Sequence, residues 1–447
     1  MKQILATLVT LVFVIVIESD WVLAAGFYIP EQGTAAMGQG EAVVARGNDP
    51  STVFHNPAGI AQLEGTQFML GTTLIAPLTT FTDGGTSTVS PAFGTLDSGT
   101  SGTETDADKP LFFPPHFYGT HLVNDRIGVG FGAFSHLGLS TEWPQDWKGR
   151  YVSYKVDIKT FFFNPNLAFK LHPAITVAAG IQYAYSTVEL KQKIPLPLWA
   201  DADLDLGVAD GDGWGYNLGA LIQVSRNNTL GINFRSPVQI HYGGEANYTL
   251  PSSACPYDAF LGPGTCTAVA AALSDSSATT DITMPAFFSI GLANNTIDGL
   301  ALEFDLQWTG WSSFDQLIVH SDNPANPISI TNKNWNDVLA LRFGGEYKLT
   351  DALAVRMGYV YDPTPVPGET LDSLLPDADR HDFSTGVGYK MGNLGIDFAY
   401  MAVVFKDRKV GNPLSAPSPV SPTTVYNQVG TYETLAHLAG LSLTYHY

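Results

Sequence analysis

Residues 435–447 read LAHLAGLSLTYHY, and this stretch decides the fold class. Apolar side chains recur along one face, and small polar side chains occupy the other. The apolar face holds Leu435, Ala439, Leu441, Leu443, Tyr445 and Tyr447, and the polar face holds Ser442, Thr444 and His446. Because successive side chains of a β-strand point to opposite faces, this period of two predicts a strand.

Other segments repeat the alternation with charged residues on the polar face. Leu302, Phe304, Leu306 and Trp308 alternate with Glu303, Asp305 and Gln307. In the same way, apolar stripes oppose Arg342, Glu346, Arg356 and Asp397. A continuous apolar stripe opposite charges is typical of a strand with lipid outside and a hydrated or plugged lumen inside.

Composition supports a membrane location without membrane helices. The chain has 22 Lys and Arg against 42 Asp and Glu, a net charge of −20, which argues against a nucleic-acid surface. Only 14% of residues are charged, well below the roughly 25% of soluble domains. Mean hydropathy is nevertheless only +0.06, and no uncharged apolar run after residue 25 approaches the ~20 residues of a membrane helix. A transmembrane β-barrel fits both facts.

The alternation predicts fourteen antiparallel strands and an all-β fold. Short turns and long Gly/Pro/Ser/Asp-rich loops alternate between them, as in an outer-membrane barrel with periplasmic turns and extracellular loops. A secreted β-sandwich is the alternative, but its exposed face would not be the apolar one. The predicted strands are 66–82, 111–123, 126–139, 151–171, 175–194, 213–225, 229–249, 281–294, 300–320, 335–349, 352–362, 380–391, 393–406 and 431–447.

Two segments precede the predicted barrel of residues 66–447. Residues 1–24 have a basic start, an apolar stretch from Ile4 to Ile17 and a small residue at Ala24, which predicts a cleaved signal peptide. Residues 25–65 are rich in small residues and contain Asn56, Pro57 and Ala58, which suggests short helices. We expect them to plug the barrel as a helical hatch and to supply partners for lumen charges, although a flexible periplasmic leader is the alternative.

The remaining chemical motifs are few. Cys255 and Cys266 are expected to form a disulfide, because the chain is expected in an oxidising compartment; the alternative, a metal site, lacks a nearby histidine. The acidic run Asp201–Asp205 is either a solvated loop or a weak site for a divalent ion. We find no catalytic or nucleotide-binding motif. The sequence therefore predicts no enzyme activity, no cofactor, no metal ligands and no nucleic-acid partner.

Several motifs together resemble the FadL/TodX family of outer-membrane hydrophobe transporters. They occur in order along the whole mature chain, at residues 25–27, 56–58, 147–151, 308–312, 334–337 and 365–380. The resemblance implies a 14-stranded barrel with an N-terminal hatch. It also implies that cargo first binds an apolar groove between two outer loops, then a lumen pocket near the mature N-terminus, and leaves sideways through the wall.

The resemblance assigns candidate residues to each of these sites. The groove would use Leu196, Leu198, Trp199, Phe260, Leu261 and Leu273, although these side chains could also simply pack on one another. The lumen pocket would use Phe27, Ile29, Tyr183, Tyr185, Arg342 and Arg356. The lateral exit would use Pro114, Pro115, Phe134 and Gly138, because prolines cannot donate ladder hydrogen bonds, but a simple bulge is equally consistent.

The cargo itself stays open between two classes. A fatty-acid carboxylate needs a cation in an apolar pocket, whereas a hydrocarbon needs none. The expected fifth strand lacks arginine, and Lys191, Lys193, Arg342 or Arg356 could take its place. We therefore predict a passive, monomeric channel in the bacterial outer membrane, surrounded by lipid and lipopolysaccharide. It would take up long-chain fatty acids or related lipophiles; an aromatic-hydrocarbon channel and a general porin are the alternatives.

Overall fold

The wall of the molecule is one closed antiparallel sheet. The computed structural model describes residues 26–447 except 110, 327 and 416–418, so the predicted signal peptide lies outside the described residues. The first strand pairs with the last over its whole length, from Gln67 with His446 to Asp83 with Gly430. That pairing closes the predicted barrel of fourteen strands.

Several wall strands are interrupted, so fourteen barrel strands comprise twenty segments. Three further strands, β2 (Ser87–Ser90), β3 (Gly94–Ser98) and β4 (Glu104–Asp106), belong to the first long loop. The wall segments are β1 (Thr66–Asp83), β5 (Pro115–Asn124), β6 (Ile127–Phe134) with β7 (Gly138–Glu142), β8 (Lys155–His172), β9 (Ile175–Ile194), β10 (Ala202–Ser225), β11 (Asn228–Arg235) with β12 (Val238–Thr249), β13 (Ser276–Met284) with β14 (Phe287–Ile297), β15 (Leu300–Thr309) with β16 (Gln316–Ser321), β17 (Ile328–Asn332) with β18 (Val338–Lys348), β19 (Leu353–Asp362), β20 (Arg380–Met391), β21 (Leu394–Phe405) with β22 (Arg408–Ser415), and β23 (Val425–His446).

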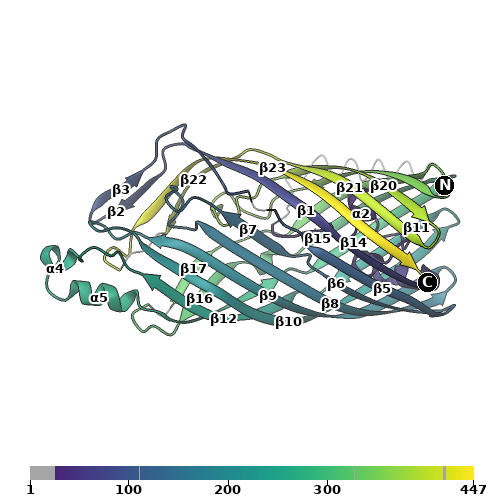
Figure 1. The fold of residues 1–447 in the computed structure, drawn as a ribbon, viewed down its shortest axis with the longest axis horizontal. Coiled ribbons are helices and arrows are strands. Elements are labelled where there is room, and N and C mark those ends of the chain that lie inside the picture. The colour runs from purple at the N-terminus through teal and green to yellow at the C-terminus, as the bar shows by residue number, and fades with distance from the viewer. Residues whose placement is uncertain (1–25, 110, 327, 416–418) are drawn as a thin grey trace.

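The helices are short. Helices α2 (Thr34–Met37) and α3 (Thr52–His55) and the 3₁₀ helix η1 (Pro57–Gln62) belong to the N-terminal segment. Helices α4 (Tyr257–Phe260) and α5 (Thr265–Ala272) project from the opposite end of the barrel to the C-terminus (Figure 1). A last 3₁₀ helix, η2 (Trp311–Ser313), follows β15. No helix in the described ranges is long and apolar enough to cross a membrane.

The predicted faces of the strands are confirmed. On β23, Leu441 and Tyr445 are about half exposed on the outside, whereas Ser442 and Thr444 are buried on the inside. On β15 and β18, the charged Glu303, Asp305 and Arg342 are buried in the lumen. Large apolar side chains therefore cover the outer surface, where lipid would contact them.

Several strand boundaries differ from the prediction, and the largest difference is at β10. The sequence predicted a strand from residue 213, but β10 begins at Ala202 and includes Asp203 and Asp205 of the acidic run. Asp203 lies opposite Lys193 of β9, and Asp205 lies opposite Lys191. The strand extends beyond the expected membrane zone because these facing charges pair across the ladder, and pairing of opposite charges stabilises neighbouring strands.

Residues 26–65, here called the hatch, fill the lumen against inward-facing glycines. A Cβ at Gly231 would lie 2.2 Å from the Val44 carbonyl oxygen, and one at Gly358 would lie 2.0 Å from the Gly40 nitrogen. Gly344 meets the hatch backbone equally closely, at Gln39. Only glycine leaves room for the hatch backbone at this distance from the wall.

Polar contacts also join the hatch to the wall. The Arg46 Nε atom lies 2.7 Å from a Glu303 carboxylate oxygen, and both side chains are nearly inaccessible to solvent. The backbone nitrogen of Ala45 donates to the other oxygen of Glu303, and that of Val44 donates to Asp305. Asn56 caps η1 and donates to the Ala220 carbonyl of β10. Lumen charges thus find partners in the hatch.

Candidate functional site

An apolar cavity of about 100 Å³ lies inside the barrel beside Phe27. Its walls come from β7, β8, β9, β10, β12 and β13, through inward side chains such as Ile158, Leu190 and Ile282. Phe314, Trp335 and Leu375 complete it from the connecting segments. We call this space the apolar pocket. Because its lining is almost entirely hydrocarbon, it can hold an apolar molecule released from water.

A buried ion pair lies at the edge of the apolar pocket. The Lys333 Nζ atom is 2.6 Å from an Asp372 carboxylate oxygen, and both residues line the pocket. Lys333 is 3% exposed and Asp372 is 5% exposed. The Thr370 hydroxyl donates to the Lys333 carbonyl at 2.5 Å. Lys333 could not be identified from the sequence, because it lies in the connection between β17 and β18, where no strand period indicates the direction of a side chain.

A second cavity, of about 390 Å³, reaches from the lumen to the outer face of the wall. We call it the wall cavity. Pro114, Pro115 and Gly138 line it, and so does Phe113, which is 57% exposed. Its inner end is formed by Gly26, Phe27, Tyr28 and Ile29 of the hatch. Three of the four residues that the sequence predicted for a lateral exit therefore line the wall cavity.

The third barrel strand breaks beside this cavity. Between β6 and β7, residues 135–137 leave the ladder and pair with the hatch instead. The Ile29 nitrogen donates to the His136 carbonyl at 2.9 Å, and the Gly138 nitrogen donates to the Phe27 carbonyl at 3.0 Å. The hatch thus supplies hydrogen bonds that a neighbouring strand would otherwise give.

Phe27 lines both cavities, together with Leu139, Ile158 and Leu375. Its ring packs edge-on against Trp311, with ring centroids 4.6 Å apart. Gly26 has a φ of 58°, and a Cβ there would meet the Trp311 ring at 2.5 Å. Only glycine combines this backbone conformation with so close a contact.

The position of Gly26 also depends on Asp377. The Gly26 nitrogen donates to an Asp377 carboxylate oxygen at 3.2 Å, and the Thr364 hydroxyl donates to the same oxygen at 2.7 Å. Burial raises the pKa of Asp377 to about 6, because the surrounding protein disfavours the charged form. The hatch tip is therefore attached to a carboxyl group that titrates near neutral pH.

Several predicted lumen residues lie elsewhere. Tyr183 and Tyr185 are on the outer face of β9, so their assignment to the pocket was wrong; Gln182 and Ala184 face inward instead. Arg342 lines a separate small cavity between the hatch and the wall. Arg356 pairs with Glu346 and Asp397 and lines none of the cavities described here. Of the predicted set, only Phe27 and Ile29 border the two main cavities.

Phe134 was placed at the lateral exit, and the structure corrects this. Its side chain is 1% exposed and points into the lumen, where it stacks on Phe162 with ring centroids 6.1 Å apart. The guanidinium of Arg235 lies 5.2 Å from its centroid. Phe134 is the last residue of β6 and keeps the inward direction of that strand, so it supports the hatch rather than the exit.

The two lysines expected to bind a carboxylate lie outside the barrel. On β9 they alternate with Leu190, which faces the apolar pocket. Lys191 pairs with Asp205 and Glu189, and Lys193 pairs with Asp203. Asp201 pairs with Arg150 at 2.9 Å. The acidic run is thus neutralised by neighbouring cations, and the described residues contain no group of three side chains suited to a metal ion.

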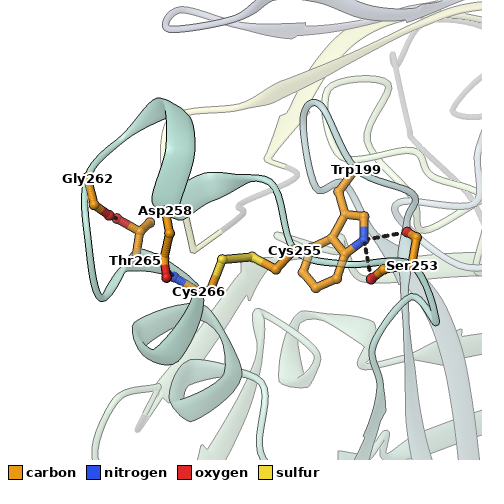
Figure 2. Close-up of a disulfide and its surroundings, with 7 residues drawn as sticks. All are labelled: Trp199, Ser253, Cys255, Asp258, Gly262, Thr265 and Cys266. Atoms are coloured by element: carbon orange, nitrogen blue, oxygen red, sulfur yellow. Dashed lines mark hydrogen bonds between the residues drawn. A yellow bond between two sulfur atoms is a disulfide. The ribbon is translucent and has the colours of Figure 1, made fainter.

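The loops predicted to form a groove are partly packed and partly exposed. Leu196 and Leu273 are buried together with Tyr257, whereas Leu198, Phe260 and Leu261 are about half exposed or more. Trp199 donates to the Ser253 hydroxyl at 2.8 Å, next to the disulfide between Cys255 and Cys266 (Figure 2). The disulfide closes the segment that contains α4, and with it the exposed Phe260.

Comparison with known proteins identifies relatives over the whole chain. Residues 15–447 match the family described as outer membrane protein transport protein (OMPP1/FadL/TodX). The chain is 24% identical over 423 residues to the long-chain fatty acid transport protein of Salmonella typhi, covering 90% of this chain and 92% of that protein. It is 26% identical over 395 residues to the 47 kDa outer membrane protein of Pasteurella multocida, covering 84% and 86%.

Solved structures share the fold. A FadL homologue of Pseudomonas aeruginosa matches with a TM-score of 0.80 and 23% identity, covering 94% of this chain and 99% of that one. The toluene transporter TbuX of Ralstonia pickettii matches with a TM-score of 0.66 and 16% identity, covering 93% and 98%. At these identities the likeness concerns the barrel and its hatch region rather than the cargo.

Proposed function

Because the chain belongs to the OMPP1/FadL/TodX family of outer membrane transport proteins, we propose that it is a passive channel for hydrophobic molecules. It lies in the outer membrane and is a transport protein rather than an enzyme. In this proposal the signal peptide of residues 1–24 is removed, and the hatch gates a barrel formed by residues 66–447. Cargo collects on the apolar loop residues, enters the apolar pocket, passes Phe27 and leaves through the wall cavity.

The observation that carries the proposal is the shared position of Phe27. Phe27 lines both the apolar pocket and the wall cavity, and Leu139, Ile158 and Leu375 are the other residues that the two cavities share. Removing apolar surface from water provides about 25 cal/mol per Å², so a hydrophobic molecule needs no energy source to enter such a route. The exposed Phe260 and Leu261 supply apolar surface at the extracellular end.

Release through the wall follows from the same geometry. The membrane interior is the most favourable environment for a hydrophobic molecule, and the wall cavity opens toward it between Pro115 and Gly138. Proline gives no ladder hydrogen bond, and residues 135–137 have exchanged theirs for contacts with the hatch. A shift of the hatch therefore opens the wall without breaking a continuous ladder.

Uptake in cells tests the proposal. A host that lacks its own transporter of hydrophobic molecules would express the chain and grow on oleate or toluene. In Gly138→Leu the new side chain fills the wall cavity, since even a Cβ there lies 3.2 Å from Ile29. The matched control is Gly411→Leu, because a Cβ at Gly411 has no neighbour within 4 Å. Growth should be lost in the first variant and kept in the second.

Two results would contradict the proposal. If the wild-type chain supports growth on neither compound, transport of hydrophobic molecules is wrong. If Gly138→Leu supports growth as well as the wild type, the wall cavity is not the exit. A general porin, the remaining alternative, would conduct ions in planar bilayers with the hatch in place, whereas a plugged barrel would not.

A further inference from the structure

The charged groups around the apolar pocket leave no free cation for an anionic cargo. Among its described lining residues, the charged ones are Lys333, Asp372 and Glu245. Lys333 is already paired with Asp372, and Glu245 is exposed at the edge. The three groups together carry one net negative charge. A carboxylate entering the pocket would therefore meet an excess of negative charge in an apolar space.

Hydrogen bonds hold both members of the ion pair between Lys333 and Asp372 in place. The Leu374 nitrogen donates to the second Asp372 oxygen at 3.0 Å, which fixes the direction of the carboxylate. The Lys333 backbone is fixed by its own nitrogen, which donates to the Asp315 carbonyl at 2.7 Å, and by the Thr370 hydroxyl. Breaking a buried pair of this kind by removing one partner is strongly unfavourable.

We propose that Asp372 makes the apolar pocket selective for uncharged cargo, because it occupies the position on Lys333 that a cargo carboxylate would take. This inference rests on the proposed transport function and names its cargo class: hydrocarbons, and amphiphiles whose head group is neutral, such as alcohols, esters or protonated acids. An ionised fatty acid has to displace Asp372 or share one ammonium with it. In the first case a buried carboxylate loses its partner, and in the second two carboxylates lie together beside one ammonium.

A neutral head group meets no such obstacle. The Lys333 ammonium has three donors, and one of them serves Asp372. An alcohol or carboxylic acid can accept a hydrogen bond from a remaining donor without adding charge. An arene needs no polar partner and uses only the apolar lining. Asp372 therefore acts as a specificity-determining residue. The ion pair still offers hydrogen-bond donors to a neutral head group, but it does not favour anions.

Binding of two matched probes to the folded protein in lipid nanodiscs tests the inference. The probes are 11-bromoundecanol and 11-bromoundecanoate at a pH where the acid is ionised, and bromine quenching of tryptophan fluorescence reports binding. Trp335 lines the apolar pocket, so Trp335→Phe identifies the part of the quenching that arises there. Heat-modified mobility on gels shows that each variant is a folded barrel.

Three proteins separate the electrostatic effect from damage to the fold. Wild type should bind the alcohol at least about tenfold more tightly than the carboxylate, because one charge-assisted bond is at stake. Asp372→Asn leaves Lys333 unneutralised and should reverse or abolish this preference. The double variant Lys333→Gln with Asp372→Asn has no local charge at this position, and its preference for the alcohol should return.

The contrary results are distinct. Equal binding of both probes by the wild type would overturn the inference while leaving the transport proposal intact. An unchanged preference in folded Asp372→Asn would also overturn it. Binding of neither probe, with no quenching that depends on Trp335, would show that the apolar pocket is not a cargo site and would refute the proposed function as well.

Discussion

The attachment of the hatch to the wall yields a prediction with a defined magnitude. Arg46→Met removes the cation that pairs with Glu303, whose side chain has no exposed surface. The Ala45 nitrogen still donates to Glu303, but the negative charge is no longer neutralised. Breaking one partner of a buried pair costs about 3–5 kcal/mol. The population of molecules with a displaced hatch should therefore rise by about two to four powers of ten.

Conductance of single barrels in planar bilayers measures this change. A fourteen-strand barrel without a plug is wide enough for ions, so displaced hatches appear as open events. Arg46→Met should open far more often than wild type. The matched control is Arg46→Met with Glu303→Gln, which removes both charges and should restore most of the closed state. Equal opening by the single and double variants would refute the reasoning, because the loss would then come from packing rather than from the unpaired carboxylate.

Three other changes give separate tests. Gly358→Ala should prevent the hatch from packing against the wall, since the new Cβ would lie 2.0 Å from the Gly40 nitrogen. Protease should therefore cleave the hatch faster in this variant than in Gly411→Ala. Asp377, whose folded pKa of about 6 exceeds its ordinary value of 3.8, stabilises the fold fully below pH 3.8 and loses this contribution as pH rises through 6. Across this pH range the unfolding free energy of the wild type should therefore fall by up to about 3 kcal/mol. The unfolding free energy of Asp377→Asn should not show this fall. The double variant Cys255→Ser with Cys266→Ser removes the crosslink between two positions that are 11 residues apart. The loop should lose about 3 kcal/mol of stability, and protease should cleave it faster, whereas the melting temperature of the barrel should not change.

The barrel wall could be predicted because one rule governs every strand. Outer and inner residues alternate, so segments such as 435–447 reveal both the strand and its direction. The same rule, applied to β9, places Tyr183 and Tyr185 outside, next to the inward Gln182 and Ala184. Their assignment to the lumen came from the family resemblance, and it failed because a position within a strand fixes its face. The alternation was the better guide.

The site was less predictable because its decisive contacts join connecting segments. Lys333 and Asp372 are 39 residues apart, one after β17 and the other between β19 and β20, and no period describes either position. Phe27 and the break at residues 135–137 are joined by hydrogen bonds between the hatch and the wall. The sequence indicated some of these residues individually, but it could not show which of them contact one another.

The barrel wall and the apolar pocket differ in how much sequence change they tolerate. The wall tolerates exchange of one outward apolar residue for another, so a TM-score of 0.80 persists at 23% identity. The apolar pocket tolerates far less, because a single change at Asp372 alters the charge that cargo meets. Two barrels of the same shape can therefore take different cargo, and the partner of the lysine at the pocket edge is a more direct guide to cargo charge than the fold. In this chain that partner is a carboxylate already in place.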